Sequence, residues 1–197
     1  MVTNEYDALT LILSSKYRCK MTSSVSIVLE ETTGSPSLMI NLKLGYKGVD
    51  GFELYRLEDK GAKLLQPFLN HNNNNVGNER KSPKYLVSMC DYMSVCSYKG
   101  KTYVFLFELK RGTTDDYQKQ LDAGECLLRY LYDSIDRIKE YDNISFDRSL
   151  IKVKKFLVKQ NKSNKQCIQS ANVVSGDEEF FKVETNNELR LLKLLNT

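Results

Sequence analysis

Residues 102–109, Thr-Tyr-Val-Phe-Leu-Phe-Glu-Leu, constrain the fold more than any other part of the sequence. A nearly continuous run of β-branched and aromatic residues is typical of a strand that is buried on both faces. Two charged residues stand at its end: Glu108 lies within the run and Lys110 follows it directly. They are two positions apart and therefore point to the same face of the strand. This strand is the centre from which the rest of the fold is predicted.

The part of the chain that precedes this strand predicts one helix and several strands. Residues 4–20 carry apolar side chains at helical spacing, which suits an amphipathic helix. Residues 25–57 contain three clusters of apolar residues that are typical of strands. Turn residues at 34–36 and 48–51 separate these clusters. Residues 84–98, rich in Tyr, Val, Met and Cys, predict a further strand that joins 102–109 through a turn at Gly100.

The part of the chain that follows the strand alternates between helix and strand. Apolar residues at spacings of three and four predict a helix over 115–141, and its small residues Ala123 and Gly124 allow close approach to a sheet. Strands are predicted at 151–158 and near 180–183. A capping box, Thr185-x-x-Glu188, predicts the start of a short Leu-rich helix.

These elements predict a single α/β domain over residues 1–197. We expect a central mixed β-sheet flanked by helices, with an additional β-rich region on its N-terminal side. Residues 1–83 form the N-terminal helix and β-rich part, 84–158 the core, and 159–197 the C-terminal strand and helix. The length is that of one ordinary domain with a core of its own.

Composition excludes several functional classes. No stretch approaches the roughly 18 apolar residues of a membrane span, and the first residues lack the basic start of a secretory signal. The five cysteines are odd in number and form no Cys-x-x-Cys pair, so we expect reduced thiols in a cytoplasmic protein with no membrane partner. Glycine patterns of phosphate-binding loops are absent.

The single histidine, His71, excludes a metal site built from several histidines. Residues 61–69 suit a short helix, and 70–83 form a loop rich in Asn and charged residues. His71 lies in this loop and is interpreted as an ordinary loop residue. The formal charge of +4 permits nucleic-acid binding but does not demand it.

The charged end of the apolar strand needs a chemical explanation, because charges that leave a core are costly unless paired, solvated or bound to metal. A hairpin through Gly100 pairs residues whose numbers sum to about 200, which brings Asp91 near Glu108 and Lys110. Two carboxylates are hard oxygen ligands for Mg²⁺ or Mn²⁺. The metal activates a bound water, and a lysine stabilises the transition state of phosphodiester hydrolysis.

Asp91, followed by Glu108-x-Lys110 at the end of an apolar strand, resembles the PD-(D/E)XK nuclease superfamily. The resemblance covers residues 84–158, in the order strand, strand, helix, strand. Cys90-Asp91 resembles the Cys-Asp variant of the family's Pro-Asp. In some branches a Gln stands on the following helix, where Gln120 fits and Gln118 is the competitor.

The resemblance implies a restriction-endonuclease-like core and a metal-dependent nuclease, with DNA favoured over RNA. It implies that Asp91, Glu108 and the Leu109 carbonyl bind Mg²⁺ or Mn²⁺, that Lys110 positions the nucleophile and that Gln120 assists. A bacterial defence or repair assembly is the implied setting, with a homodimer or a partner protein that regulates activity. The family often adds a glutamate from an N-terminal helix, for which the candidates are Glu5, Glu53 and Glu58.

The same residues also have purely structural interpretations. Glu108 and Lys110 also suit a solvent-facing pair at a strand end, and Asp91 alone suits a turn residue. Arg111, Lys152 and Lys154 are candidates for phosphate contacts, with a solvated strand face as the equal alternative. The alternative function is a binding or assembly module that kept the nuclease fold and lost cutting.

Overall fold

The computed structural model describes residues 2, 4–20, 26–31, 38–45, 48–57, 89–110, 117–160, 167–170, 179–185 and 188–197. Its helices are α1 (Glu5–Ile12), α3 (Tyr117–Asp142) and α4 (Leu191–Leu195), with 3₁₀ turns at Ser15–Tyr17 and Arg148–Leu150. Its strands are β1 (Ser26–Glu31), β2 (Leu38–Lys43), β3 (Val49–Arg56), β4 (Tyr92–Tyr98), β5 (Lys101–Lys110), β6 (Ile151–Gln160), β7 (Cys167–Ser170), β8 (Glu179–Thr185) and β9 (Glu188–Arg190).

The chain is an α/β protein with mixed sheets. Six strands form the central sheet in the order β3-β4-β5-β6-β8-β7. Strands β3, β4 and β5 pair antiparallel, and β6 and β8 then continue parallel to β5. A second sheet has the order β1-β2-β9, in which β9 pairs parallel to β2. Both sheets therefore combine strands from distant parts of the sequence.

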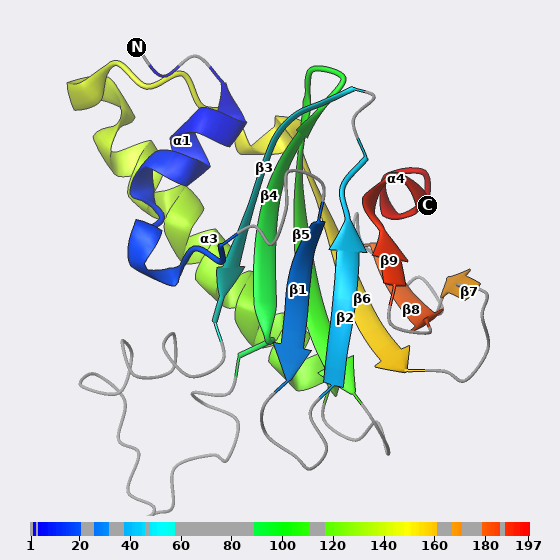
Figure 1. Cartoon of the computed structure of the whole chain (residues 1–197). Coiled ribbons are helices and arrows are strands. Elements are labelled where there is room, and N and C mark those ends of the chain that lie inside the picture. Colours follow the sequence, from blue (N-terminus) through cyan, green and yellow to red (C-terminus); the bar gives the residue numbers. More distant parts are fainter. Residues whose placement is uncertain are drawn as a thin grey trace, which may run out of the picture.

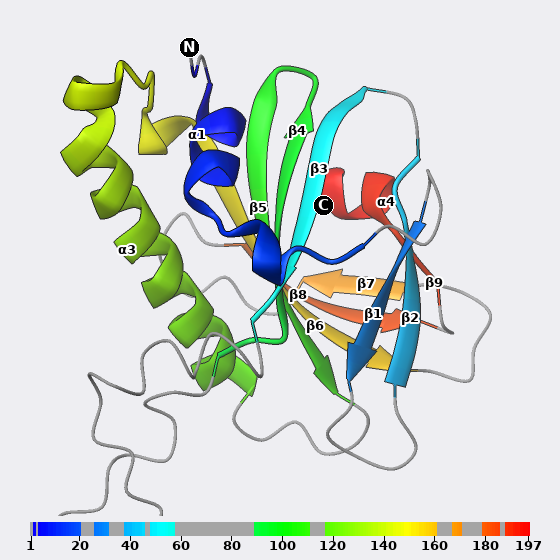
Figure 2. The ribbon, with the colours of Figure 1, turned by 60° about the vertical axis from the view of Figure 1, so that its left-hand side comes forward.

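Three layers cover one another, with the central sheet in the middle. Helices α1 and α3 lie on one face of that sheet, and the second sheet lies on the other (Figures 1 and 2). Within the described part of the chain, no helix is both long and apolar enough to cross a membrane. Burial of β5 on both faces is confirmed, since all of its residues except the first and last are buried.

The hairpin of β4 and β5 sets the register of the central sheet. Its two-residue turn, Lys99-Gly100, has positive φ at both residues, as a type I′ hairpin requires. Tyr92 pairs with Phe107, so paired numbers sum to 199 rather than the predicted 200. The predicted hairpin is confirmed, and the one-residue correction moves the partner of position 91 from 109 to 108.

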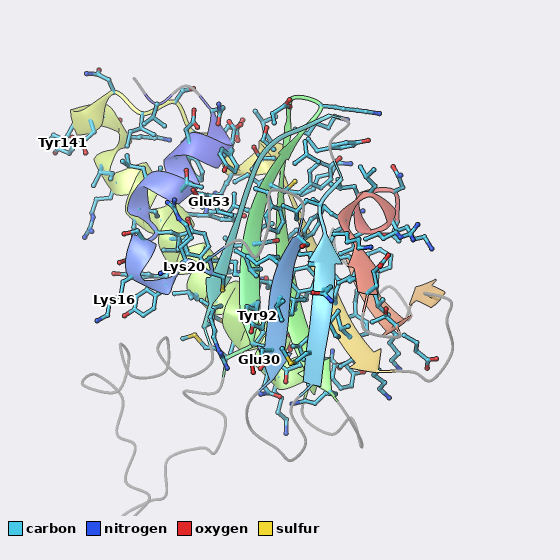
Figure 3. The ribbon with its side chains drawn as sticks, viewed as in Figure 1. Lys16, Lys20, Glu30, Glu53, Tyr92 and Tyr141 are labelled. Carbon is cyan, nitrogen blue, oxygen red and sulfur yellow. The ribbon has the colours of Figure 1, made fainter. Side chains whose placement is uncertain are left out.

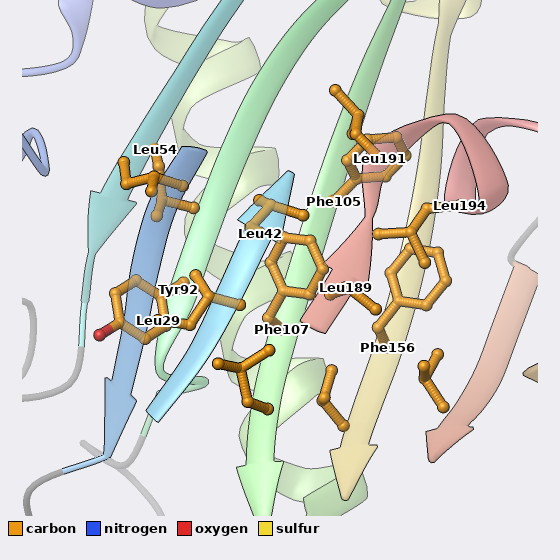
Figure 4. Packing of buried hydrophobic residues seen from close by; sticks show 14 of the residues in the cluster. Leu29, Leu42, Leu54, Tyr92, Phe105, Phe107, Phe156, Leu189, Leu191 and Leu194 are labelled. Carbon is orange, nitrogen blue, oxygen red and sulfur yellow. The ribbon is translucent and has the colours of Figure 1, made fainter. Parts of the chain in front are cut away.

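Aromatic rings fill the space between the two sheets. Phe107 stacks on Phe156 with ring centroids 5.6 Å apart, and Phe156 stacks on Phe181 at 5.4 Å (Figure 4). Leucines of β1, β2, β9 and α4 close over these rings. The Tyr92 hydroxyl also bridges the layers, because it accepts from the Glu30 amide at 2.7 Å and donates to the Glu30 carbonyl at 2.8 Å (Figure 3).

Helix α3 approaches the other face closely, as its small residues predicted. A Cβ atom added at Gly124 would lie 2.5 Å from the Cys90 Sγ and 3.6 Å from the Leu106 side chain. Glycine is thus required where α3 crosses the start of β4 and the middle of β5. Cys90 is fully buried under this crossing.

Several local predictions need correction. Helix α1 ends at Ile12, and a 3₁₀ turn follows in place of a continuous helix to residue 20. Gly51 lies within β3 rather than in a turn. The predicted capping box is wrong: Thr185 ends β8, Glu188 begins β9, and α4 starts only after Arg190 without a side-chain cap. The predictions for 61–69 and 70–83, including His71, lie outside the described residues.

Candidate active site

Asp91 sits immediately before β4 and joins the strands on either side of it. Its backbone carbonyl accepts from the Leu57 amide at 2.9 Å, next to β3. Its carboxylate Oδ2 accepts from the Leu109 amide of β5 at 2.5 Å. The side chain is buried, so this charge-assisted hydrogen bond fixes the carboxylate against the end of β5.

Glu108 and Lys110 form an ion pair at the end of β5. The Lys110 Nζ lies 2.5 Å from the Glu108 Oε1. The Glu108 side chain is 0% exposed and that of Lys110 is 20% exposed, so the lysine leads from the buried carboxylate towards solvent. A buried charge of this kind persists only with a close partner, because desolvation of a carboxylate costs several kcal/mol.

Glu108 lies on the face of the central sheet that α1 and α3 cover, because Leu106, two residues before it on β5, packs in that cluster. Asp91 precedes β4 and does not follow the alternation of that strand, since Cys90 and Met93 both pack beneath the helices. Its contacts give its place: the register of Tyr92 with Phe107, continued by one residue, sets Asp91 opposite Glu108, and its carboxylate accepts from the Leu109 amide. Both residues therefore lie at the end of β5.

The thiol of Cys90 lies near the carboxylates of both Glu108 and Asp91. Burial is the main cause that raises the pKa of Cys90 well above its ordinary value, and the negative charges of Glu108 and then Asp91 raise it further. Lys155 lowers it. Cys90 therefore stays a protonated thiol, hydrogen-bonded to the Tyr92 carbonyl at 3.6 Å, and has no nucleophilic character.

Two further charged residues, Lys155 on β6 and Glu125 on α3, lie in the same layer. The Lys155 Nζ is 2.5 Å from the Glu125 Oε2 and 3.1 Å from the Asp122 Oδ1. Glu125 also pairs with Arg129. We call Asp91, Glu108, Lys110, Glu125 and Lys155 the carboxylate–lysine cluster. A signal for Glu125 exists in the sequence, since it falls four residues after Leu121 on the buried stripe of the helix.

Gln120, the predicted assisting residue, lies one turn before Gly124 on α3 and is half-buried, whereas its competitor Gln118 is exposed. Four helical residues advance about 6 Å, and two strand residues about 6.6 Å. Gly124 sits beside Leu106, and α3 starts near the end of β5, so Gln120 lies on the turn of α3 nearer to that end (Figure 1).

The structure separates other predicted residues from this cluster. Lys152 and Lys154 alternate with Lys155 on β6 and so belong to the opposite face. Lys152 is exposed, but Lys154 is buried, with its Nζ 3.4 Å from the Leu194 carbonyl and 5.6 Å from the centre of the Phe181 ring. The predicted phosphate contact of Lys154 thus falls on a buried side chain of that opposite face, and it stays a prediction. Arg111 lies outside the described residues.

The glutamates considered for an N-terminal acid do not complete the cluster. Glu53 pairs with Arg18 at 3.0 Å and lies opposite Val95, four residues from Asp91 (Figure 3). Four strand residues span about 13 Å, which is too far for one metal ion. Glu5 begins α1, and Glu58 lies outside the described residues.

Asp91 and Glu108 are the metal ligands that the sequence predicted, and both lie at the end of β5. Among these segments, no group of three or more His, Cys, Asp and Glu side chains is placed to hold a metal ion. Asp91 and Glu108 are the two oxygen donors at the end of β5, and the Leu109 amide is engaged by Asp91. Among the described cysteines, Cys90, Cys96 and Cys126 form no disulfide.

Comparison with known proteins gave no relative: no family model matches the sequence, and neither curated proteins nor solved structures give a significant match.

Proposed function

We propose that this protein is a metal-dependent nuclease of the PD-(D/E)XK type that hydrolyses phosphodiester bonds, with DNA favoured over RNA. One observation carries the proposal: Glu108 is fully buried, 2.5 Å from Lys110, at the end of β5 where the Asp91 carboxylate accepts from the Leu109 amide. The alternative interpretation, an ordinary solvent-facing ion pair at the end of a strand, would leave the carboxylate exposed.

The order of elements supports a restriction-endonuclease-like core. Strands β4 and β5 form an antiparallel hairpin, α3 follows, and β6 returns parallel to β5. This is the strand, strand, helix, strand order that the resemblance implies for residues 84–158. Both acids and Lys110 lie at one end of the hairpin, beside the start of α3.

Each residue has a distinct proposed role. Asp91 and Glu108 would hold Mg²⁺ or Mn²⁺ through oxygen atoms, with water and the Leu109 carbonyl as further donors. A metal bound there would supply an activated water and a Lewis acid for the phosphate. Lys110, the more exposed partner of Glu108, orients the attacking water or neutralises charge on the phosphate. Gln120 assists from the first turns of α3.

The setting of this activity is also proposed from the resemblance alone. A cytoplasmic nuclease needs control, so we propose a regulating partner protein or a second copy of the chain, within a bacterial defence or repair assembly. Of the two β6 lysines predicted to contact phosphate, Lys152 is exposed and Lys154 is buried, so we keep Lys152 as the candidate.

The direct test is cleavage of single-stranded and duplex DNA and RNA in Mg²⁺ or Mn²⁺. We expect Glu108→Ala and Lys110→Ala each to lower the cleavage rate by about 10²- to 10³-fold, as loss of a transition-state contact does. Glu108→Gln, which keeps shape, separates lost chemistry from lost folding. The exposed residues Glu140 and Lys193 provide matched controls, Glu140→Ala and Lys193→Ala. Equal cleavage by all variants would sink the proposal.

One observation favours a second function, a binding module that kept the fold and lost cutting. Glu108 is 0% exposed and engaged by Lys110, and the described residues provide no third acidic ligand. Titration calorimetry with Mn²⁺ discriminates the two functions. Binding that Glu108→Gln abolishes supports the nuclease, and no binding by the wild type supports the module.

A further inference from the structure

We propose that the buried Lys155–Glu125 ion pair is a positioning element, which holds α3 and its Gln120 over the carboxylates of Asp91 and Glu108. The inference deepens the proposed nuclease function and rests on it. Neither Lys155 nor Glu125 has a catalytic role in the proposed nuclease. The support for the inference is the burial of the two side chains and the contacts of their neighbours.

The Lys155–Glu125 ion pair is buried, although a salt bridge that only links a helix to a strand could form at the surface. The side chains of Lys155 and Glu125 are 8% and 12% exposed, and their charged atoms are 2.5 Å apart. Burying two charges costs several kcal/mol per ion before their attraction offsets it, and apolar residues of similar size stabilise such sites as well or better. Stability alone therefore gives no reason for this pair on the apolar stripe of α3.

The pair lies beside the proposed site in two directions. On the sheet, Lys155 pairs with Leu106, two residues before Glu108 on the same face. On the helix, Glu125 follows Gly124, where an added Cβ atom would lie 2.5 Å from the Cys90 Sγ. Cys90 is the residue before Asp91. The charges of Lys155, Glu108 and Asp91 all act on that thiol. One ion pair thus connects β6 and α3 at the strand position two residues before Glu108 and next to the helix residue that approaches Cys90.

Lys155 also spans the start of the helix. It contacts Asp122 and Glu125, three residues apart on α3, so its charge holds almost a full turn. The ring of Tyr117 stacks on Phe180 of β8 at 5.6 Å, which keeps the first residue of α3 attached independently. Loss of the pair is therefore expected to displace the turn that carries Gln120 rather than to release the helix.

The test uses Cys90 as a reporter of this displacement. Lys155→Met removes the charge at nearly equal length, Lys155→Arg keeps it, and Lys193→Met, at an exposed lysine of α4, is the control. Alkylation of the native full-length protein by iodoacetamide is followed by mass spectrometry at Cys90 and at Cys96. Both thiols are fully buried, but Cys96 packs on the opposite face of the central sheet.

We expect Lys155→Met to raise the alkylation rate of Cys90 about tenfold, as a local opening does, with Cys96 unchanged. Lys155→Arg should return the rate towards that of the wild type. In the cleavage assay, Lys155→Met should lower kcat about 10²-fold with KM unchanged, since a misplaced group affects the reaction step. Lys193→Met should leave both alkylation rates as they are.

The outcomes separate this inference from the proposed function. An equal rise at Cys90 and Cys96 means global destabilisation and overturns the positioning role, as does no change at Cys90. A wild type that cleaves no substrate defeats the nuclease proposal, while the alkylation ratio still decides whether the pair positions α3. Selective alkylation together with a kcat effect that Lys155→Arg rescues supports both.

Discussion

The two faces of the central sheet differ in what they bury, although alternate residues of the same strands build them. Between the sheets, the rings of Phe105, Phe107, Phe156 and Phe181 follow one another across β5, β6 and β8. Beneath α1 and α3, aliphatic side chains such as Leu106 give way to the carboxylate–lysine cluster at the end of β5. Phe107 and Glu108 are neighbours in sequence and face opposite layers.

The difference separates stability from chemistry. The aromatic face buries large apolar surfaces, which is the main source of folding free energy. The charged end of the helix face removes ions from water, which lowers stability. Such charges are therefore expected where a function requires them. Three substitutions, one on each face and one between the layers, test this division.

Phe107→Ala should give the largest effect. The ring is fully buried and lies 5.6 Å from that of Phe156 and 6.1 Å from that of Phe105. We expect the free energy of unfolding to fall by about 3–5 kcal/mol, the usual result of emptying a buried aromatic site. Urea denaturation followed by circular dichroism measures it. A larger loss for Leu106→Ala, on the helix face of the same strand, would contradict the comparison.

Tyr92→Phe should have an intermediate effect that depends on pH. The hydroxyl bonds to both the amide and the carbonyl of Glu30, so its removal should cost about 1–3 kcal/mol at neutral pH. Burial raises the pKa of Tyr92 from 10.0 to about 12. Folding thus favours the protonated phenol, and this contribution is complete below pH 10 and is lost as the pH rises through 12.

The measurement compares denaturation of wild type and Tyr92→Phe at pH 7 and above pH 10. The stability difference should shrink at alkaline pH, because only the wild-type chain gains by ionising this phenol on unfolding. Other buried phenols and thiols are common to both proteins and cancel. A difference that stays constant above pH 10 would show that Tyr92 does not join the layers as described.

Glu108→Leu should have the smallest effect on stability. An apolar side chain replaces a buried carboxylate, and the partly exposed Lys110 remains able to reach water. We expect a free energy of unfolding within about 1 kcal/mol of the wild type, since buried ion pairs contribute little net stability. The proposed nuclease activity should nevertheless be lost. A loss of stability as large as that of Phe107→Ala would break the division between the faces.

Local patterns account for the elements that the sequence predicted well. The apolar run of β5, the Gly100 turn and the three-and-four spacing of α3 each specify an element without reference to the rest of the chain. The hairpin turn fixes the β4–β5 register to within one residue, which is why Asp91 and Glu108 were correctly expected near each other. Alternation along β5 also correctly set Lys110 with Glu108.

Contacts between distant elements account for what the sequence did not predict. No turn fixes the register of β5 with β6, because α3 connects them, and a single-residue shift decides whether Lys154 or Lys155 faces the helix. Lys152 and Lys154 were singled out because they share one strand face, whereas Lys155, on the other face, pairs with Leu106 two residues before Glu108. The three-residue strand β9 has too little sequence to reveal its pairing with β2, and its residues were interpreted as a helix start.

The parallel pairing of β2 with β9 has a consequence for the order in which the protein matures. Asn41 pairs with Glu188, so the sheet that covers the aromatic face combines an early and a late segment of the chain. A ribosome makes the rings of β5 and β6 before it makes β9. Throughout that interval the aromatic face has an incomplete cover, and contacts so distant in sequence form slowly. We expect the nascent chain to expose its most hydrophobic surface longest, which is the surface that chaperones bind.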